Sequence, residues 1–378
     1  MTLALPKIAV LDSSTLGKVS RDYWSPDQKP RAKARTFVED LLKRGVFVAF
    51  TLTHISELLR HKNDEVVQDR IRFLRSIQLI AWLRPYDRTW FPGSIFDLLT
   101  RELHAVLHEP TRSWEHVIQN VRTGLWETGT GADMFVENNE LWSAIREESK
   151  RQLDHEIYAA SVATTYPSEI AGMKLKEMQN SPRRPKEERG DYARQSSTEM
   201  ARQLDHHGDA RLDRRQEIAA DFMNDSLVRM QHIDALGGDP LERLLEIADV
   251  PKELLAPDTT QEEIGELAIY ARRLAFLGKK LNPPQAVRMV EAPSRTLPSY
   301  VLERKLAYFQ GKADRVSSSD LGDSYIAPLV FYAEGVEVDK RTCHYLKQVQ
   351  RAEPTLARLM RPFFQSADYA EIPKRFDD

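Results

Sequence analysis

The stretch Lys7-Ile-Ala-Val-Leu-Asp-Ser-Ser-Thr15 decides the fold that we expect. Its first part, Lys7 to Leu11, is a short apolar run that predicts a buried β-strand. Asp12 follows directly, in a polar segment that predicts a loop. An acidic side chain is thereby expected at the carboxyl end of a buried strand, which is where a parallel sheet binds its ligands.

The segments that follow alternate between helical and strand patterns. Residues 35–43 carry apolar side chains at helical spacing, and residues 46–50 form a second apolar run. Two more helices are expected, one after Thr53 and one over residues 65–76, before residues 77–83 predict a third strand. This order of elements is the one expected of an α/β domain with a parallel sheet.

The alternation stops after the third strand and returns near the C-terminus. From residue 94 to about residue 282 the periodicity is helical with no convincing strand, and residues 180–198 have the polar, charged composition of an exposed linker. A helix over 299–310, a helix starting near Asp320 and a short strand at 336–339 complete the pattern. The expected domains are an N-terminal α/β part (1–93), a large all-helical insertion (94–294, with the linker near 180–198) and a C-terminal α/β part with a tail (295–378).

Composition excludes several classes of protein and site. The 378 residues include one cysteine, Cys343, so an internal disulfide framework and a cysteine-based zinc site are excluded. A formal net charge of −3 gives no global basic excess, so any nucleic-acid binding would use local patches. The longest apolar runs are far shorter than the roughly 20 residues that a membrane-spanning helix needs. We therefore expect a cytoplasmic protein with no membrane partner.

Acidic residues gather at the expected binding edge of the sheet. Asp12, Glu57 and Asp339 come at or just after the carboxyl ends of predicted strands. Asp320 and Asp323 are three residues apart at a helix start, so both carboxylates are expected on one helical face. Carboxylate oxygens select Mg²⁺ or Mn²⁺, and such an ion can polarise a phosphoryl oxygen and activate a bound water. The acids therefore predict a metal-dependent site for phosphodiester hydrolysis.

The motifs that contain these acids resemble those of the PIN domain family of nucleases. They are VLDSST around Asp12, THISELLRH around Glu57, SSDLGDSYIAPL around Asp320 and Asp323, and VEVDKRT around Asp339. The resemblance covers roughly the first 90 residues and the segment from 295 to 350. It implies a PIN-like parallel sheet flanked by helices and a divalent-metal-dependent endonuclease, acting on RNA more than on DNA. It also implies that these acids are the catalytic residues and the ligands of Mg²⁺ or Mn²⁺.

The resemblance further implies different roles within the site. Thr51 or Ser13 would give polar support. The family pattern requires one acid in the helix that holds Asp320 and Asp323, and Asp323 ranks ahead because a residue inside a helix is held more rigidly than its cap. Asp339 can instead act through a water molecule in the outer shell.

Other candidate residues leave two interpretations open. Residues 18–35, KVSRDYWSPDQKPRAKAR, mix basic side chains with Tyr23 and Trp24 and predict a loop. This loop either contacts nucleic acid through cations and stacked rings or packs its rings on the protein body. His104 and His108 lie one helical turn apart, but without a third ligand in sight the metal interpretation is disfavoured.

The helical insertion has no counterpart in the compact members of the family. We expect it to select the substrate, or to hold the site inactive until a regulatory protein partner or self-association releases it. A defence or toxin-like role would fit this arrangement. The alternative is a catalytically silent, nuclease-like scaffold that binds nucleic acid or a protein partner. A haloacid-dehalogenase-type phosphatase is disfavoured, because Ser14 stands where that motif needs a second aspartate.

Overall fold

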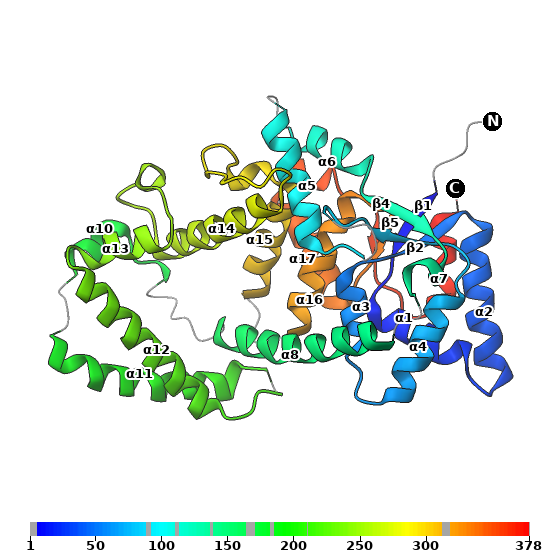
Figure 1. Cartoon of the computed structure of the whole chain (residues 1–378), viewed down its shortest axis with the longest axis horizontal. Helices are drawn as coiled ribbons and strands as arrows, with labels where there is room; N and C mark the ends of the chain where they lie inside the picture. The colour runs from blue at the N-terminus through cyan, green and yellow to red at the C-terminus, as the bar shows by residue number, and fades with distance from the viewer. Residues whose placement is uncertain are drawn as a thin grey trace.

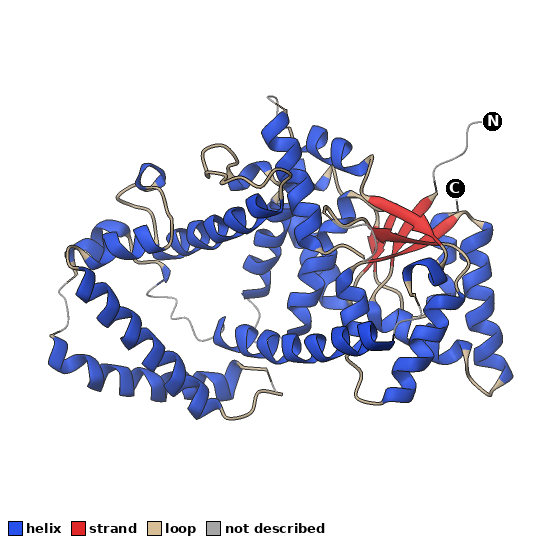
Figure 2. Cartoon of the chain, viewed as in Figure 1, coloured by secondary structure: helices blue, strands red, loops and turns tan. Residues whose placement is uncertain are grey.

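The structure is a computed structural model that describes residues 6–87, 92–109, 113–136, 139–163, 171–181, 185–209, 211–311 and 318–377. Figure 1 shows the N- and C-terminal segments together at one end of the molecule, with segments from the middle of the chain extending away from them. The strands in Figure 2 are confined to the end where the termini lie. The molecule is therefore α/β at one end and mainly helical at the other.

Six strands in the described part of the chain form one sheet with the order β4-β3-β2-β1-β5-β6. Neighbouring strands are parallel, except that β4 runs antiparallel to β3. Val10 of β1 pairs with Val336 of β5, so segments from the two ends of the chain meet inside the sheet. The predicted α/β fold with a mainly parallel sheet is confirmed. The strands are β1 (Lys7–Val10), β2 (Val46–Phe50), β3 (Ile80–Leu83), β4 (Trp126–Gly129), β5 (Gly335–Glu337) and β6 (Phe363–Phe364).

The sequence does not predict strands β4 and β6. β4 lies in the segment for which only helices are expected, and that expectation is wrong there. Its sequence, Trp-Glu-Thr-Gly, occupies the edge of the sheet with side chains that are half-buried or exposed, so it lacks an apolar run. β6 has two residues, which is too short for an alternating pattern to be recognised.

Both faces of the sheet are covered by helices, as a mainly parallel sheet requires. Ile8 and Val10 of β1 face one apolar layer, while Ala9 and Leu11 face the other. The first layer includes side chains of α5 (Ile95–His108), α6 (Trp114–Arg122), α14 (Gln261–Lys280), α15 (Pro298–Gly311), α17 (Lys340–Ala352) and α18 (Pro354–Ala357). The second includes side chains of α1 (Ser13–Tyr23), α2 (Gln28–Lys43), α3 (Leu52–Leu59), α4 (Asp64–Ser76) and α7 (Gly131–Met134).

The remaining helices extend from this body. α8 (Asn139–Ala163) packs against α3 and against α16 (Ser318–Ile326), and Figure 1 shows it running below both. α11 (Lys186–His207) and α12 (Arg215–Leu236) pack along each other as a helical hairpin at the far end. The other helices are α10 (Leu175–Asn180) and α13 (Pro240–Ile247), with short 3-10 segments at Lys252–Leu254, Ser294–Thr296, Ala327–Phe331, Tyr369–Glu371 and Pro373–Phe376.

The segment predicted as an exposed linker, residues 180–198, is helical over most of its length, because α11 begins at Lys186. Residues 182–184 lie outside the described residues. Ion pairs one turn apart, such as Arg194 with Asp191, support the helix, and Met200 and Leu204 bury its apolar side further along. A helix that is charged around most of its surface lacks the apolar periodicity by which we would have recognised it.

Candidate active site

The sheet has a topological switch point between β1 and β5. From β1 the chain continues to β2 and β3 on one side, whereas β5 and β6 lie on the other side. A crevice at the carboxyl ends of the strands is expected at such a point, and ligands of open α/β sheets bind there. Asp12 follows β1 and Asp339 follows β5. These two acids thus lie at the edge where the sequence predicts a site.

Asp12 and Asp339 are both N-cap residues of helices. One carboxylate oxygen of Asp12 accepts a hydrogen bond from the Ser14 N–H at 2.6 Å, at the start of α1. The Asp339 carboxylate accepts one from the Thr342 N–H at 2.6 Å, at the start of α17. Capping fixes the orientation of each carboxylate and adds stability to the helix. The two acids therefore have a structural role whether or not they also bind a ligand.

Helices α3 and α16 bring Glu57 and Asp323 to the same region. A methyl group added to Gly322 would lie 2.6 Å from Glu57 Oε1, so the two helices approach closely at this point. Any residue larger than glycine would push against the Glu57 carboxylate. Asp323 is the next residue of α16, and its Oδ2 accepts a hydrogen bond from Thr342 Oγ1 at 3.1 Å.

Asp323 is the electrostatic centre of these acids. Its pKa is raised to about 8, first by burial and then by the neighbouring carboxylates of Asp339, Asp12 and Glu57, against a smaller lowering by the Thr342 hydroxyl. A carboxylate raises the pKa of another carboxyl group in this way only when the two lie near each other. The structure therefore brings together four of the acids that the sequence singles out, from both ends of the chain.

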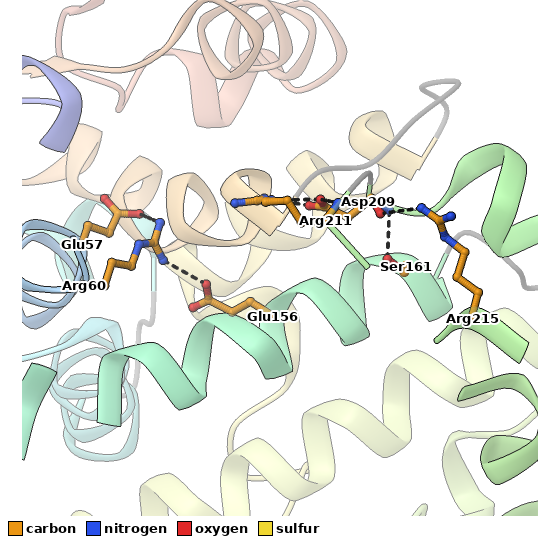
Figure 3. A network of polar contacts seen from close by, with 7 residues as sticks. All are labelled: Glu57, Arg60, Glu156, Ser161, Asp209, Arg211 and Arg215. Atoms are coloured by element: carbon orange, nitrogen blue, oxygen red, sulfur yellow. Dashed lines mark hydrogen bonds and ion pairs between the residues drawn. The ribbon is translucent and has the colours of Figure 1, made fainter. Parts of the chain in front are cut away.

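Glu57 carries a second perturbed carboxyl group. Burial raises its pKa, the Ser13 hydroxyl and Arg60 lower it, and Asp12 raises it. Arg60 lies 3.4 Å from Glu57 Oε1 and also 3.4 Å from Glu156 Oε2 of α8, as Figure 3 shows. The helical segment is thus in direct polar contact with a residue beside the candidate site.

Asp320 lies in the first turn of α16, the helix that also holds Asp323, but its side chain lies outside the described part of the structure. Among the side chains that the structure describes, no three His, Cys, Asp or Glu residues are grouped closely enough to hold one metal ion. The chemistry of the donors nevertheless fits a divalent cation, because half-buried carboxylates that repel each other would be neutralised by such an ion. A hard, oxygen-binding metal such as Mg²⁺ or Mn²⁺ matches this set.

Glu337 belongs to the same region and was missed at the sequence level. It is 2% exposed in β5, where one carboxylate oxygen accepts a hydrogen bond from Thr15 Oγ1 at 2.9 Å and the other from the Asp12 N–H at 3.3 Å. Its pKa is raised to about 7, mainly by burial and also by the nearby Asp12 carboxylate. The available signal was an acid between two valines in a buried strand, a position that an acid occupies only with partners.

His54 is a second residue that the sequence analysis did not single out. It is fully buried, and its Nδ1 accepts hydrogen bonds from the Thr51 N–H at 3.1 Å and from Thr51 Oγ1 at 2.8 Å. Nε2 therefore carries the proton and donates to the Leu11 carbonyl at 3.0 Å. Burial lowers the pKa of His54 to about 4, so the ring is neutral near pH 7. Thr51 and His54 thus connect α3 to the end of β1, directly before Asp12.

The predicted loop at 18–35 is mostly helical, because α1 extends to Tyr23 and α2 begins at Gln28. The Tyr23 ring packs 5.2 Å from the Phe73 ring, and the Trp24 N–H donates to the Asp69 carbonyl at 3.1 Å. These contacts match the interpretation in which the rings pack on the body.

The pair His104 and His108 is disfavoured as a metal site in the sequence analysis. Their rings are 4.3 Å apart, and no third ligand lies near them within the described residues. Cys343, the single cysteine, is buried and belongs to the first apolar layer.

Comparison with known proteins identifies no relative: no family model, curated protein or solved structure matches the chain. No helix in the described ranges is long and apolar enough to cross a membrane. The assignment of a function therefore depends on the residues at the sheet edge and their surroundings.

Proposed function

We propose that this protein is a divalent-metal-dependent endonuclease of the PIN-like type, which hydrolyses phosphodiester bonds and acts on RNA in preference to DNA. The observation that carries the proposal is geometric. Thr342 donates hydrogen bonds to both Asp339 and Asp323, and Glu57 Oε1 lies against Gly322, the neighbour of Asp323 in the chain. The raised pKa of Asp323 agrees with this arrangement. These acids come from opposite ends of the chain and converge at the switch point of the sheet. A cluster of this kind is costly unless a cation neutralises it.

Asp12, Glu57, Asp323 and Asp339 would hold Mg²⁺ or Mn²⁺, with Asp320 in the first turn of the same helix as Asp323. When bound, such an ion supplies Lewis acidity toward the phosphodiester and lowers the pKa of water. The chain's own groups hold the ligands in place. Thr342 orients Asp323 through its hydroxyl, and Asp339 through its backbone N–H.

Glu337 would act behind these ligands. Its two oxygens are occupied by the Thr15 hydroxyl and the Asp12 N–H, so it fixes the start of α1 and thereby the position of Asp12. Hydrogen-bonded partners of this kind determine how rigidly a ligand is held. We assign Glu337 the role of a positioning residue.

The test is cleavage of labelled single-stranded RNA, single-stranded DNA and duplex DNA in Mg²⁺, Mn²⁺ or chelator. The expected result is metal-dependent cutting that falls by at least about a hundredfold in Asp12→Asn. Asparagine caps helices as well as aspartate does, so this variant should keep the native fold. Asp27→Asn is the matched control, because Asp27 begins α2 without a capping hydrogen bond from its side chain.

Either of two results would refute the proposal. If Asp12→Asn still cuts, these acids are not the catalytic residues. Failure of the native protein to cut any substrate in any metal, together with metal-independent binding of nucleic acid, would favour the silent scaffold.

A further inference from the structure

A small cavity lies beside Glu57, at the junction of the sheet body and the helical segment. Its walls come from α3, the start of α5, α8 and α16, and its volume is about 130 Å³. Sites for whole small molecules span roughly 300 to 1,000 Å³. The cavity therefore suits a single ring system rather than a complete nucleotide. Its decisive lining residues are Glu57, Arg60, Phe96, Gln152, Glu156 and Tyr325.

One side of the cavity presents donors and acceptors of hydrogen bonds. Arg60 contacts Glu57 and Glu156 at 3.4 Å each, and the side chains of these three residues are 23%, 17% and 15% exposed. Figure 3 shows Arg60 between the two carboxylates. Two carboxylates around one guanidinium leave a net negative charge, which disfavours a phosphate inside the cavity. A neutral group that both donates and accepts hydrogen bonds fits better.

The other side of the cavity is aromatic. The Phe96 and Tyr325 rings are half-buried, with centroids 6.5 Å apart and planes inclined by 48°. Tyr325 lies in α16, two residues after Asp323, and Phe96 lies in the first turn of α5. Aromatic rings of this kind stack on nucleobases, and they tolerate any base because every base has a π face.

We propose that this cavity is the subsite for one unstacked nucleobase next to the phosphodiester that is cut. The proposal rests on the proposed nuclease function and narrows its substrate to single-stranded nucleic acid, because a base in a duplex must first lose its pairing and stacking contacts. Gln152 and Glu156 of α8 line the cavity, so the helical segment contributes directly to substrate selection.

The experiment measures binding in the Asp12→Asn background, where substrate is not consumed. The probes are fluorescein-labelled 12-nucleotide RNA homopolymers of each base and an RNA duplex of the same length, all in Mg²⁺. Gln152→Ala and Phe96→Leu are compared with Gln119→Ala, an exposed glutamine on α6 that is remote from the cavity. Gln152 is exposed, so its replacement should leave the fold intact even if Phe96→Leu disturbs packing.

We expect single strands to bind at least tenfold more tightly than the duplex. Both cavity variants should weaken the binding of single strands, and Phe96→Leu should raise the dissociation constant fivefold or more. Both should also change the order of preference among the four bases. Duplex binding and the Gln119→Ala variant should stay unchanged. Equal binding of single strands and duplex, or cavity variants that bind all homopolymers like the parent, would overturn the subsite.

The two proposals fail in distinguishable ways. If the protein cuts RNA through Asp12 but the cavity variants bind single strands normally, the nuclease proposal stands and the subsite proposal is refuted. If the protein never cuts but binds single strands through Phe96 and Gln152, the nuclease proposal is refuted. The protein would then be interpreted as a single-strand binder that uses this cavity.

Discussion

The sheet end and the α11–α12 hairpin bury their apolar side chains in different ways. At the sheet end, two apolar layers combine side chains from both ends of the chain and from α5, α6 and α14. The hairpin packs in a small cluster in which Ile157 of α8 joins Met200, Leu204, Leu212 and Ala219. α12 also exposes large apolar side chains, among them Phe222 and Val228. Few buried contacts mean low local stability, so the hairpin should open more easily than the sheet.

The largest expected effect tests whether the two regions unfold separately. Phe50 is fully buried in β2 between His54 and Phe135, with ring centroids 6.3 and 6.2 Å away. Phe50→Ala should cost about 3–5 kcal/mol and lower protection from hydrogen exchange throughout the sheet. Leu204→Ala, also at a fully buried position, should lower protection in α11 and α12 alone. Loss of protection in β1 and β5 upon Leu204→Ala would show that the regions form one cooperative unit.

A pH effect of intermediate size is expected where α5 meets α15. Glu102 of α5 is fully buried and accepts hydrogen bonds from the Ser299 N–H at 3.2 Å and from the Tyr332 hydroxyl at 2.6 Å. Burial raises its pKa from 4.5 to about 7. The folded state thus favours protonated Glu102, and this stabilisation is complete below pH 4.5 and is lost as pH rises through 7.

Glu102→Gln isolates that contribution, because glutamine keeps an acceptor oxygen and cannot ionise. The rise in the pKa of Glu102 from 4.5 to about 7 corresponds to a loss of about 3 kcal/mol in the free energy of unfolding between pH 4 and pH 8. Urea unfolding at both pH values should therefore show a smaller loss of stability in the variant than in the native protein. An identical pH dependence in the two proteins would mean that Glu102 does not titrate in this range.

The smallest of these effects concerns the link between the two regions. Arg60→Ala leaves the partly buried carboxylates of Glu57 and Glu156 without their shared cation, which should cost about 1–2 kcal/mol after allowance for solvent screening. Hydrogen exchange in α8 should rise. Arg72→Ala is the control, because Arg72 pairs with Asp69 on the exposed side of α4. Unchanged exchange in α8 would show that apolar packing alone holds it to α3.

The two regions also differ in how much could be predicted from sequence. β1 and β2 are continuous apolar runs, so their position and the place of Asp12 were predictable from local pattern. The end of α2 was predictable too, because the sequence has a glycine, Gly45, just after it. The structure shows why a glycine suits this position: its φ is positive, at 66°. By contrast, α11 was mistaken for a linker, since its charged surface hides the helical period.

Contacts between distant residues were the main limit at the candidate site. The acids were found from their positions after strands, but the role of Glu337 depends on Thr15 and on the Asp12 N–H, which lie at the other end of the chain. The Arg60–Glu156 contact likewise joins α3 to α8. Neither contact leaves a periodic signal in the sequence, because both arise from tertiary packing.

The hydrogen bond from the Asp12 N–H to Glu337 has a consequence for synthesis of the protein. It joins residues that are 325 positions apart, and a ribosome that adds about 5–20 residues per second needs roughly 16 to 65 s to translate that stretch. β1 is translated before β5 and remains without this partner strand during the interval. Under the proposed function, the acids would form a complete set only after α16 and β5 have been translated, so the site could not act on RNA during this interval.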